Sequence, residues 1–207
     1  MIDQLGNGLQ ILIISLPSQT GRRSFQSAQM ERLGLAFRFW PATQPAEVAP
    51  EDMATRIAGW ARPLRPTEVA CLLSHRSVWA EVAKGTSPTL VLEDDAVLSE
   101  STQLLLPSLA RMADVDVLNL ETFREKKLLG KTATLELAGR WAVFPLYRDR
   151  GGAACYLLWP SGAAKLLAYT ENFSPLADAA INLVPGLRRL QIVPALAVQE
   201  MHLGTHK

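Results

Sequence analysis

Three consecutive carboxylates follow a short apolar run in the segment PTLVLEDDAV, at residues 88–97. The run TLVL has the composition of a strand that is buried on both faces. Side chains alternate along an extended chain, so we expect Glu93 and Asp95 on one side and Asp94 on the other. Neighbouring carboxylates raise one another's pKa unless something cationic lies between them. The carboxylates therefore need a partner, which is a metal ion, a basic side chain or water.

Two interpretations of this acidic motif fit the sequence. In open α/β sheets, ligands bind beyond the carboxyl ends of the strands, where a strand ending at Leu92 would leave the three acids. Carboxylates in that place suit Mg²⁺ or Mn²⁺, whose remaining ligands are often substrate phosphates. Alternatively, the acids form the first turn of the next helix, where the helix dipole and water stabilise them. We favour a metal that is bound together with a phosphate.

Four further polar residues, on or beside the predicted elements, each allow two interpretations. Ser74 and His75 lie one turn beyond Cys71 on a mostly apolar helix face, where a histidine is more often a satisfied core residue than a ligand. Arg22 and Arg23 follow the first predicted strand, where a guanidinium either reaches a phosphate or nucleotide or is simply solvated. The residues alone do not decide between these interpretations.

The second half of the chain carries three further candidates. Gly151 and Gly152 precede a predicted strand, where they either let the backbone approach a ligand or form a hairpin turn. Asp178, among small apolar residues, is either a helix N-cap or a general base. His202 and His206 belong to a polar tail and are either parts of a disordered end or metal ligands.

Strands and helices alternate in the pattern that must position these residues. A buried strand at 9–16, a turn at 17–23, a helix at 24–33 and a strand at 35–42 predict a parallel strand pair. Residues 43–66 are predicted to form a loop-rich segment that contains one short helix. The remaining predictions are a helix at 65–85, a strand at 89–95, a helix after residue 99, a strand at 116–121, two strands and a helix within 140–170, and a final strand-like run. This alternation of strands and helices predicts an α/β sheet.

Bulk composition sets the class of protein. The 207 residues suit a single domain over 1–207, and a net charge of +1 gives no drive toward nucleic acid. The two cysteines, Cys71 and Cys155, lie far apart in apolar contexts and are interpreted as buried thiols. The first 17 residues have neither a basic region nor an apolar run long enough to span a bilayer. We therefore expect a cytoplasmic protein without signal peptide or membrane anchor.

Taken in order, these pieces resemble glycosyltransferase family 25. The resemblance covers about residues 10–185, and the combination of LSH with EDDA at this separation is its most specific part. The first strand departs from the family, because SLPSQTGRR stands where members more often show an Asn before the Leu and an Asp-rich turn. The stretches that show the resemblance are IISLPSQTGRR with MERLGLAFRFWPA, RPTEVACLLSHRSVW, TLVLEDDAVL and GGAACYLLWPSGAAKLLAYTENFSPLADAAI.

The resemblance implies a GT-A type fold, which is a Rossmann-like α/β/α sandwich with a mostly parallel central sheet. It implies metal-dependent, inverting transfer of a sugar, with galactose our first choice, from a UDP-sugar to a saccharide acceptor in lipooligosaccharide or surface glycan synthesis. The cofactor would be Mn²⁺ or Mg²⁺. The implied residues are Asp178 as the base, Asp95, Glu93 and His202 (or His206) at the metal, and Arg23, Ser74, His75, Glu93, Asp94, Gly151 and Gly152 at the nucleotide sugar.

Two alternatives to this activity fit the sequence: the protein is inactive, or it catalyses a different reaction. A catalytically inactive family member would bind a nucleotide sugar or glycan, or serve in an assembly complex. A metal-dependent phosphoryl or nucleotidyl transferase would use carboxylates at a strand end equally well. Because the acceptor would be a glycan or a lipid-linked saccharide, we expect a protein that is either soluble or in peripheral contact with the inner face of the membrane, without an amphipathic anchor in the sequence.

Overall fold

A mixed, nine-stranded sheet forms the centre of the molecule, in the order β2-β1-β3-β9-β5-β10-β8-β6 with β7 paired to β8. The computed structural model describes residues 9–123 and 125–205. The strands of this sheet are β1 Gln10–Ser15, β2 Arg38–Pro41, β3 Thr89–Glu93, β5 Val117–Asn119, β6 Leu128–Leu129, β7 Leu135–Leu137, β8 Trp141–Arg148, β9 Cys155–Leu158 and β10 Arg189–Val193.

Most strands of the sheet share one direction. β1 is parallel to both β2 and β3, and β10 is parallel to β5. The antiparallel β9 lies between β3 and β5, and β8 runs antiparallel to β10 at the other side. The prediction of a mostly parallel sheet is therefore confirmed, as is the parallel pairing of the first two predicted strands.

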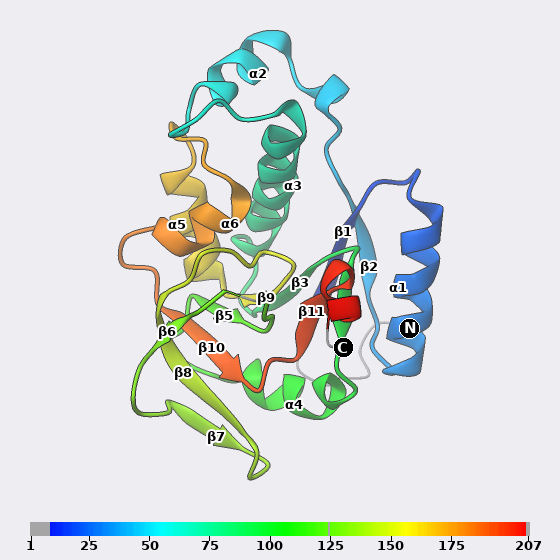
Figure 1. Cartoon of the computed structure of the whole chain (residues 1–207), viewed down its shortest axis with the longest axis vertical. Coiled ribbons are helices and arrows are strands. Elements are labelled where there is room, and N and C mark those ends of the chain that lie inside the picture. Colours follow the sequence, from blue (N-terminus) through cyan, green and yellow to red (C-terminus); the bar gives the residue numbers. More distant parts are fainter. Residues whose placement is uncertain (1–8, 124, 206–207) are drawn as a thin grey trace.

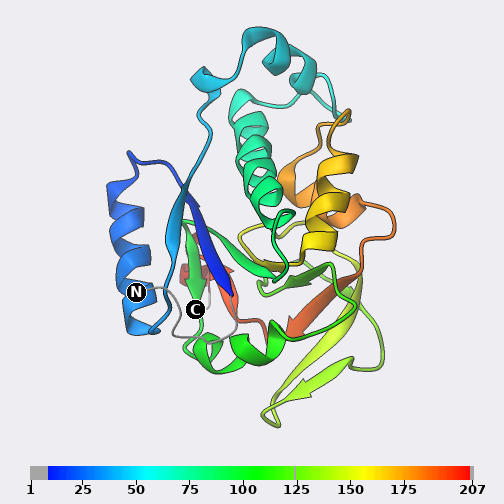
Figure 2. The same ribbon diagram turned by 180° about the vertical axis from the view of Figure 1, so that it is seen from behind.

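Helices cover both faces of the sheet, as Figures 1 and 2 show from opposite sides. Alternate side chains of β1 divide between two apolar cores: Leu12 joins residues of α3, α5 and α6, whereas Ile11 joins residues of α1 and α4. The expected α/β/α sandwich is confirmed. The helices are α1 Thr20–Arg32, α2 Pro50–Ile57, α3 Pro66–Val82, α4 Ser101–Leu109, α5 Pro160–Tyr169 and α6 Ala177–Leu183, with short 3-10 turns η1 Pro45–Glu47 and η2 Glu200–Thr205.

A second, two-stranded sheet brings the end of the described chain to the acidic motif. β3 ends at Glu93, a turn over 94–95 follows, and β4 (Ala96–Leu98) pairs antiparallel with β11 (Ala197–Gln199). The backbone N–H of Glu200 donates to the carbonyl of Asp95 at 2.8 Å. Consequently η2 and its His202 lie beside the carboxyl end of β3, about a hundred residues away in sequence.

Several sequence predictions differ from the structure. Helix α1 begins at Thr20 rather than residue 24, which places Arg22 and Arg23 on the helix instead of in a turn. The hairpin interpretation of Gly151 and Gly152 is wrong, because β8 pairs with β10 while β9 pairs with β3 and β5. Across the described helices, we find none with the length and apolar character that crossing a membrane requires.

Candidate active site

A cleft of about 390 Å³ opens at the carboxyl ends of the central strands and gathers five of the predicted site residues. Its walls come from β3, the start of α3, the segment after β5, the loop before β9, the start of α6 and the C-terminal segment. The five predicted residues that line it are Glu93, Gly151, Gly152, Asp178 and His202. Ligands of α/β sheets bind at this edge, so the cleft is the candidate active site.

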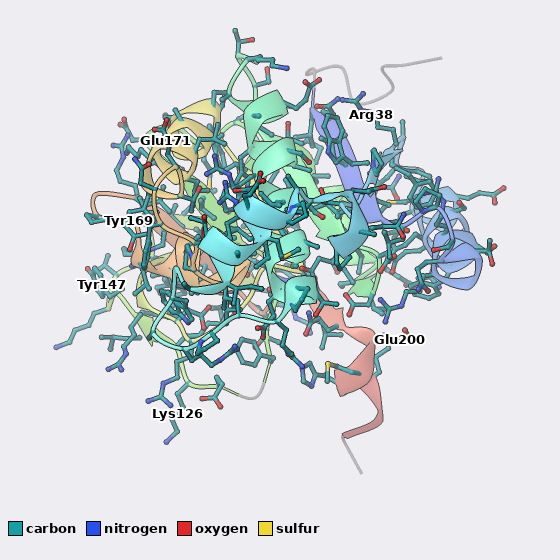
Figure 3. All side chains as sticks on the ribbon, turned by 90° about the horizontal axis from the view of Figure 1, so that it is seen from above. Arg38, Lys126, Tyr147, Tyr169, Glu171 and Glu200 are labelled. Carbon is teal, nitrogen blue, oxygen red and sulfur yellow. The ribbon has the colours of Figure 1, made fainter. Side chains whose placement is uncertain are left out.

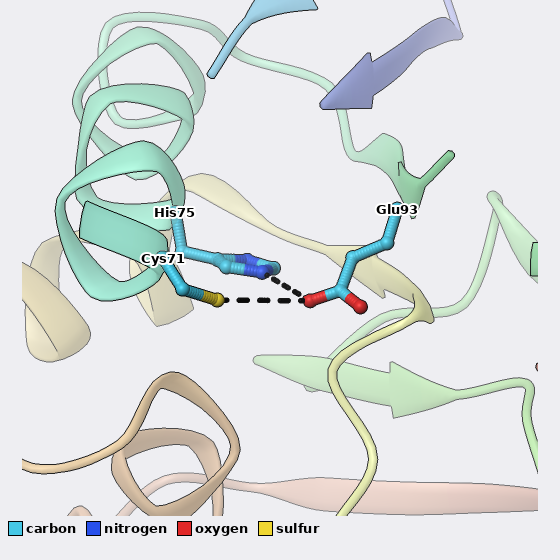
Figure 4. A group of neighbouring side chains, drawn as sticks. All are labelled: Cys71, His75 and Glu93. Atoms are coloured by element: carbon cyan, nitrogen blue, oxygen red, sulfur yellow. Dashed lines mark hydrogen bonds and ion pairs between the residues drawn. The ribbon is translucent and has the colours of Figure 1, made fainter. Parts of the chain in front are cut away.

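Glu93 is held from the α3 side of the sheet (Figure 4). His75 Nε2 lies 3.0 Å from Glu93 Oε1, and Cys71 Sγ lies 3.9 Å from the same oxygen. Burial alone would raise the pKa of Glu93, but the hydrogen bond and the charge of His75 bring it below its ordinary value. Glu93 is therefore a carboxylate that is fixed in orientation and ionised in the cleft.

His75 connects Glu93 to the core. Its Nδ1 lies 2.9 Å from Tyr156 Oη, which in turn accepts a hydrogen bond of 2.9 Å from Trp79 Nε1. Burial opposes a charge on the ring, but the contacts with Tyr156, Cys71 and Glu93 raise the His75 pKa well above its usual 6.5. His75 has no exposed surface, so the structure places it behind Glu93, and its predicted contact with a nucleotide sugar stays a prediction.

Asp94 points to the opposite face of the sheet, as strand alternation predicts. Its carboxylate accepts hydrogen bonds from Ser15 Oγ at 2.8 Å and from Arg22 Nη1 at 3.0 Å. Gln26 on α1 donates to the Asp94 carbonyl at 3.1 Å. The basic partner that the acidic motif called for is thus Arg22 for Asp94, and this pair fixes α1 against the end of β3.

Asp95 is the member of the motif that lacks such a partner. Its Oδ1 is buried and, among the described residues, meets no hydrogen-bond donor. Burial, followed by the charge of Glu93, raises the pKa of Asp95 to about 6. A divalent cation would supply the missing partner and keep the carboxylate ionised. The residues present therefore fit the metal that the family resemblance implies.

Glu121, which the sequence reading did not single out, is a further acid of the cleft. Its side chain follows β5 and is 2 % exposed, and its Oε1 accepts the backbone N–H of Ala154 at 2.9 Å. Burial, with the charges of Glu93 and Asp149, raises its pKa to about 7. The available signal was its place at the end of a predicted strand, LNLE, where acids of α/β sheets meet a ligand.

The two glycines make room for cleft side chains. A Cβ on Gly151 would lie 2.7 Å from the Phe123 ring, and one on Gly152 would lie 2.9 Å from Glu121 Oε1. Gly152 also has a φ of +102°, which L residues rarely adopt. Phe123 in turn stacks on His202, with ring centroids 6.3 Å apart. Contact of these glycines with a sugar donor stays a prediction.

Asp178 lies in the first turn of α6, at the wall of the cleft. The N-cap is Leu176, so Asp178 is not the cap that one interpretation proposed, although its Oδ1 accepts the N–H of Ala179 at 2.7 Å. Burial, together with the charge of Glu93, raises its pKa. A carboxyl group whose pKa is shifted toward neutrality is suited to accept a proton.

The remaining predictions lie away from the cleft or are corrected. Arg23 stacks over Phe39 at 3.9 Å, and the buried Ser74 Oγ donates to the Ala70 carbonyl at 2.8 Å while accepting the Thr43 N–H. The interpretation of both cysteines as buried is wrong for Cys71, which is exposed because its face of α3 opens to the cleft. His206 lies outside the described residues.

A protein-family model matches most of the chain, including most of the segments that form the cleft. The model of glycosyltransferase family 25, described as an LPS biosynthesis protein, matches residues 9–181. The chain belongs to glycosyltransferase family 25. The match covers the LSH and EDDA segments and reaches Asp178, so the family 25 assignment includes most of the cleft. The protein is accordingly a glycosyltransferase that takes a sugar donor and a saccharide acceptor.

Curated members of family 25 extend the comparison over almost the whole chain. The lacto-N-neotetraose biosynthesis glycosyltransferases LgtB and LgtE of Neisseria meningitidis serogroup B are each 28% identical over 94% of this chain, covering 76% and 75% of their own lengths. Among solved structures, a glycosyltransferase involved in glycosylation of the major capsid of PBCV-1 covers 92% of this chain and 93% of its own, with a TM-score of 0.49 and 12% identity.

Proposed function

We propose that this family 25 member transfers a sugar, with galactose our first choice, from a UDP-sugar to a saccharide acceptor in lipooligosaccharide synthesis, with inversion and with a divalent metal. The observation that carries the proposal is the buried Asp95 Oδ1 just after β3, which meets no hydrogen-bond donor in the described part of the chain. The biosynthetic role rests on the LgtB and LgtE relatives, which are lacto-N-neotetraose biosynthesis enzymes by name.

The metal would be Mn²⁺ or Mg²⁺, held by Asp95. Glu93 and His202 are further candidate ligands, since both line the cleft. When bound, such a cation neutralises charge on a departing diphosphate. Asp94 would act indirectly, because its bonds to Ser15 and Arg22 fix the turn that carries Asp95.

Asp178 is the proposed proton acceptor for the acceptor hydroxyl. It lies on the wall of the same cleft as Glu93, and burial raises its pKa, which makes it a stronger proton acceptor than an ordinary aspartate. Inversion needs a base on the acceptor side of the sugar, and a carboxyl group at the start of a helix is held rigidly enough to serve. The alternative, an inactive member that binds a nucleotide sugar or glycan, shares this cleft and differs in lacking turnover.

The proposed location is cytoplasmic, with peripheral contact at the inner face of the membrane. Supporting it, Leu128 and Tyr147 on β6 and β8 are 58% and 62% exposed. Leu128 pairs with the exposed Arg148, which follows Tyr147 in β8, and the exposed Lys126 lies two residues before Leu128. Figure 3 shows Tyr147 and Lys126 at the outer edge of the molecule, on the same side. Apolar and basic side chains together favour an anionic membrane surface.

Calorimetric titration of UDP tests the metal-dependent donor site. We expect binding that requires Mn²⁺ and is lost in Asp95→Asn, because the amide removes the charge that the cation needs. Asp114→Asn is the matched control, since Asp114 is exposed and pairs with Arg188 on the surface. Binding of UDP that is indifferent to both Mn²⁺ and Asp95 would overturn the metal site.

Product analysis then tests the reaction. Release of UDP together with a longer glycan, with the opposite anomeric configuration to the donor, supports inverting transfer. UDP binding without any product from a panel of UDP-sugars and saccharide acceptors would favour the inactive alternative. Release of pyrophosphate would instead indicate nucleotidyl transfer.

A further inference from the structure

Three residues of different chemistry converge on one point at the wall of the cleft. The Sγ of Cys71, a ring nitrogen of His75 and a carboxylate oxygen of Glu93 all lie within 4.8 Å of one another (Figure 4). We propose that Cys71, His75 and Glu93 form a binding site for a thiophilic divalent cation, Zn²⁺, in addition to the Mn²⁺ or Mg²⁺ site proposed at Asp95, with which it would share Glu93.

Helix geometry makes this cluster possible. Cys71 and His75 are four residues apart on α3, so their side chains share one face of the helix. Glu93 reaches the same point from the end of β3, on the side of the sheet that α3 covers. The three ligands therefore come from two rigid elements, and no loop has to rearrange to bring them together.

The distances suit a tetrahedral zinc ion. Zinc bonds of about 2.3 Å to sulfur and about 2.0–2.1 Å to nitrogen or oxygen place ligand atoms about 3.3–3.6 Å apart. The present separations from Glu93 Oε1 are 3.0 Å to His75 Nε2 and 3.9 Å to Cys71 Sγ. Shifts of a few tenths of an ångström would bring both into the expected range, and the fourth position faces the cleft that Cys71 and Glu93 line.

A second layer of contacts supports the histidine as a ligand. A metal-binding histidine usually holds its other ring nitrogen in a hydrogen bond, which fixes its orientation. His75 Nδ1 has that partner in Tyr156 Oη at 2.9 Å, and Trp79 Nε1 holds the tyrosine at 2.9 Å. Zinc would replace the proton that His75 Nε2 shares with Glu93, and it would take the Cys71 sulfur as a thiolate by releasing the thiol proton.

The ligand set selects the metal. Sulfur and imidazole ligands favour Zn²⁺, whereas Mg²⁺ and Mn²⁺ prefer sites of oxygen ligands. The consequence for activity, which rests on the proposed function, is inhibition. Because Glu93 is also a candidate ligand of the donor metal, zinc at this point withdraws it from donor binding and occupies part of the cleft.

Cysteine protection tests the site on the unmodified protein, without donor or acceptor. Cys71 is exposed and Cys155 is buried, so alkylation by iodoacetamide, followed by mass spectrometry, reports Cys71. We expect stoichiometric Zn²⁺ to suppress alkylation of Cys71, and Mg²⁺ or Mn²⁺ at the same concentration to leave it unchanged. Alkylation of Cys71 at the same rate with and without Zn²⁺ would overturn the proposal.

Cobalt spectroscopy tests the ligands directly. Co²⁺ bound by a thiolate gives a near-ultraviolet charge-transfer band, which we expect in the native protein and in Cys155→Ala but not in Cys71→Ser. Tyr156→Phe should keep the band and weaken zinc binding about 10- to 100-fold, as loss of an outer-shell partner does. A band that persists in Cys71→Ser contradicts the site. None of these readouts depends on UDP or on transfer, so failure of the zinc site and failure of the proposed function are separable.

Discussion

At the scale of single residues, the cleft and the turn that follows β3 hold acids whose environments differ. Glu93 is ionised by its contact with His75, whereas Asp95, Glu121 and Asp178 have raised pKa values, chiefly because of burial. Different environments give chemically similar groups different tasks. Asp95, whose Oδ1 meets no hydrogen-bond donor among the described residues, is the acid suited to a cation, and Asp178 is the one placed for proton transfer.

Asp178→Asn should abolish most turnover and spare donor binding. The amide cannot accept the proton of the acceptor hydroxyl, and loss of a positioned acid or base typically costs about 10²- to 10⁴-fold in kcat. UDP binding in the presence of Mn²⁺ should change little, because the donor metal is assigned to Asp95. A kcat within twofold of the native value, measured by UDP release, would remove Asp178 from the role of base.

Glu121→Gln should change how stability depends on pH. In the unfolded chain Glu121 loses its proton near its ordinary pKa of 4.5, whereas in the fold it keeps the proton until about pH 7. The free energy of unfolding therefore falls as pH rises between these values, by up to about 3 kcal/mol from this group. The glutamine variant is neutral throughout and should lack that fall.

Urea unfolding at pH 5 and pH 8 measures this difference. The stability of Glu121→Gln relative to the native protein should increase from the lower to the higher pH. Glu136→Gln is the control, because Glu136 is exposed on β7. A difference between native and Glu121→Gln proteins that is the same at both pH values would show that Glu121 titrates normally in the fold.

At the scale of elements, the cleft depends on how closely backbone segments approach it. The loop before β9 passes so near Asn119 and Glu121 that a Cβ on Gly152 would lie 2.9 Å from atoms of both. The antiparallel β9, inserted between β3 and β5, requires this loop to cross the carboxyl end of the sheet. Strand order thereby delivers Gly151 and Gly152 to the site.

Gly152→Ala should destabilise the protein more than Gly139→Ala. Both glycines have a positive φ, of +102° and +64°, which costs an L residue about 1–2 kcal/mol. A Cβ on Gly139 meets nothing within 4 Å, whereas one on Gly152 also displaces Glu121, and overpacking costs about 1–3 kcal/mol more. Urea unfolding compares the two variants, and equal losses would argue against close packing at Gly152.

At the scale of the whole molecule, one edge combines apolar and basic groups. Exposed Leu128 and Tyr147 lie on the paired strands β6 and β8 with exposed Lys126 and Arg148 as chain neighbours, away from the α2 end of the molecule (Figure 1). The cleft itself carries several acids, so this edge, and not the cleft, is the surface suited to an anionic membrane.

Binding to anionic vesicles should depend on this edge. We expect cosedimentation with vesicles that contain phosphatidylglycerol, and reduced cosedimentation for Tyr147→Glu, which removes an aromatic contact and adds a negative charge. Phe25→Glu is the control, because Phe25 is 43% exposed on α1, which lies on the opposite side of the molecule from β8 (Figure 1). Equal sedimentation of the native protein with neutral and anionic vesicles, or without vesicles, would contradict peripheral contact through this edge.

Local sequence patterns were sufficient to predict the layered α/β class, the buried strands β1 and β3, helix α3 and the opposite orientations of Glu93 and Asp94. These features follow from local periodicity, because side chains alternate along a strand and apolar residues recur along a helix. The LSH and EDDA segments were also sufficient to indicate the family, which the match over residues 9–181 shows.

The set of residues that share the cleft could be known only from the tertiary structure. The insertion of β9 between β3 and β5, the pairing of β11 with β4 and the exposure of Cys71 depend on contacts between distant segments. For that reason local patterns did not indicate Glu121 or Phe123, and they favoured Arg23 as a binding residue although Arg22 is the arginine that binds Asp94. Local patterns report the face of an element, and only packing reports which faces meet.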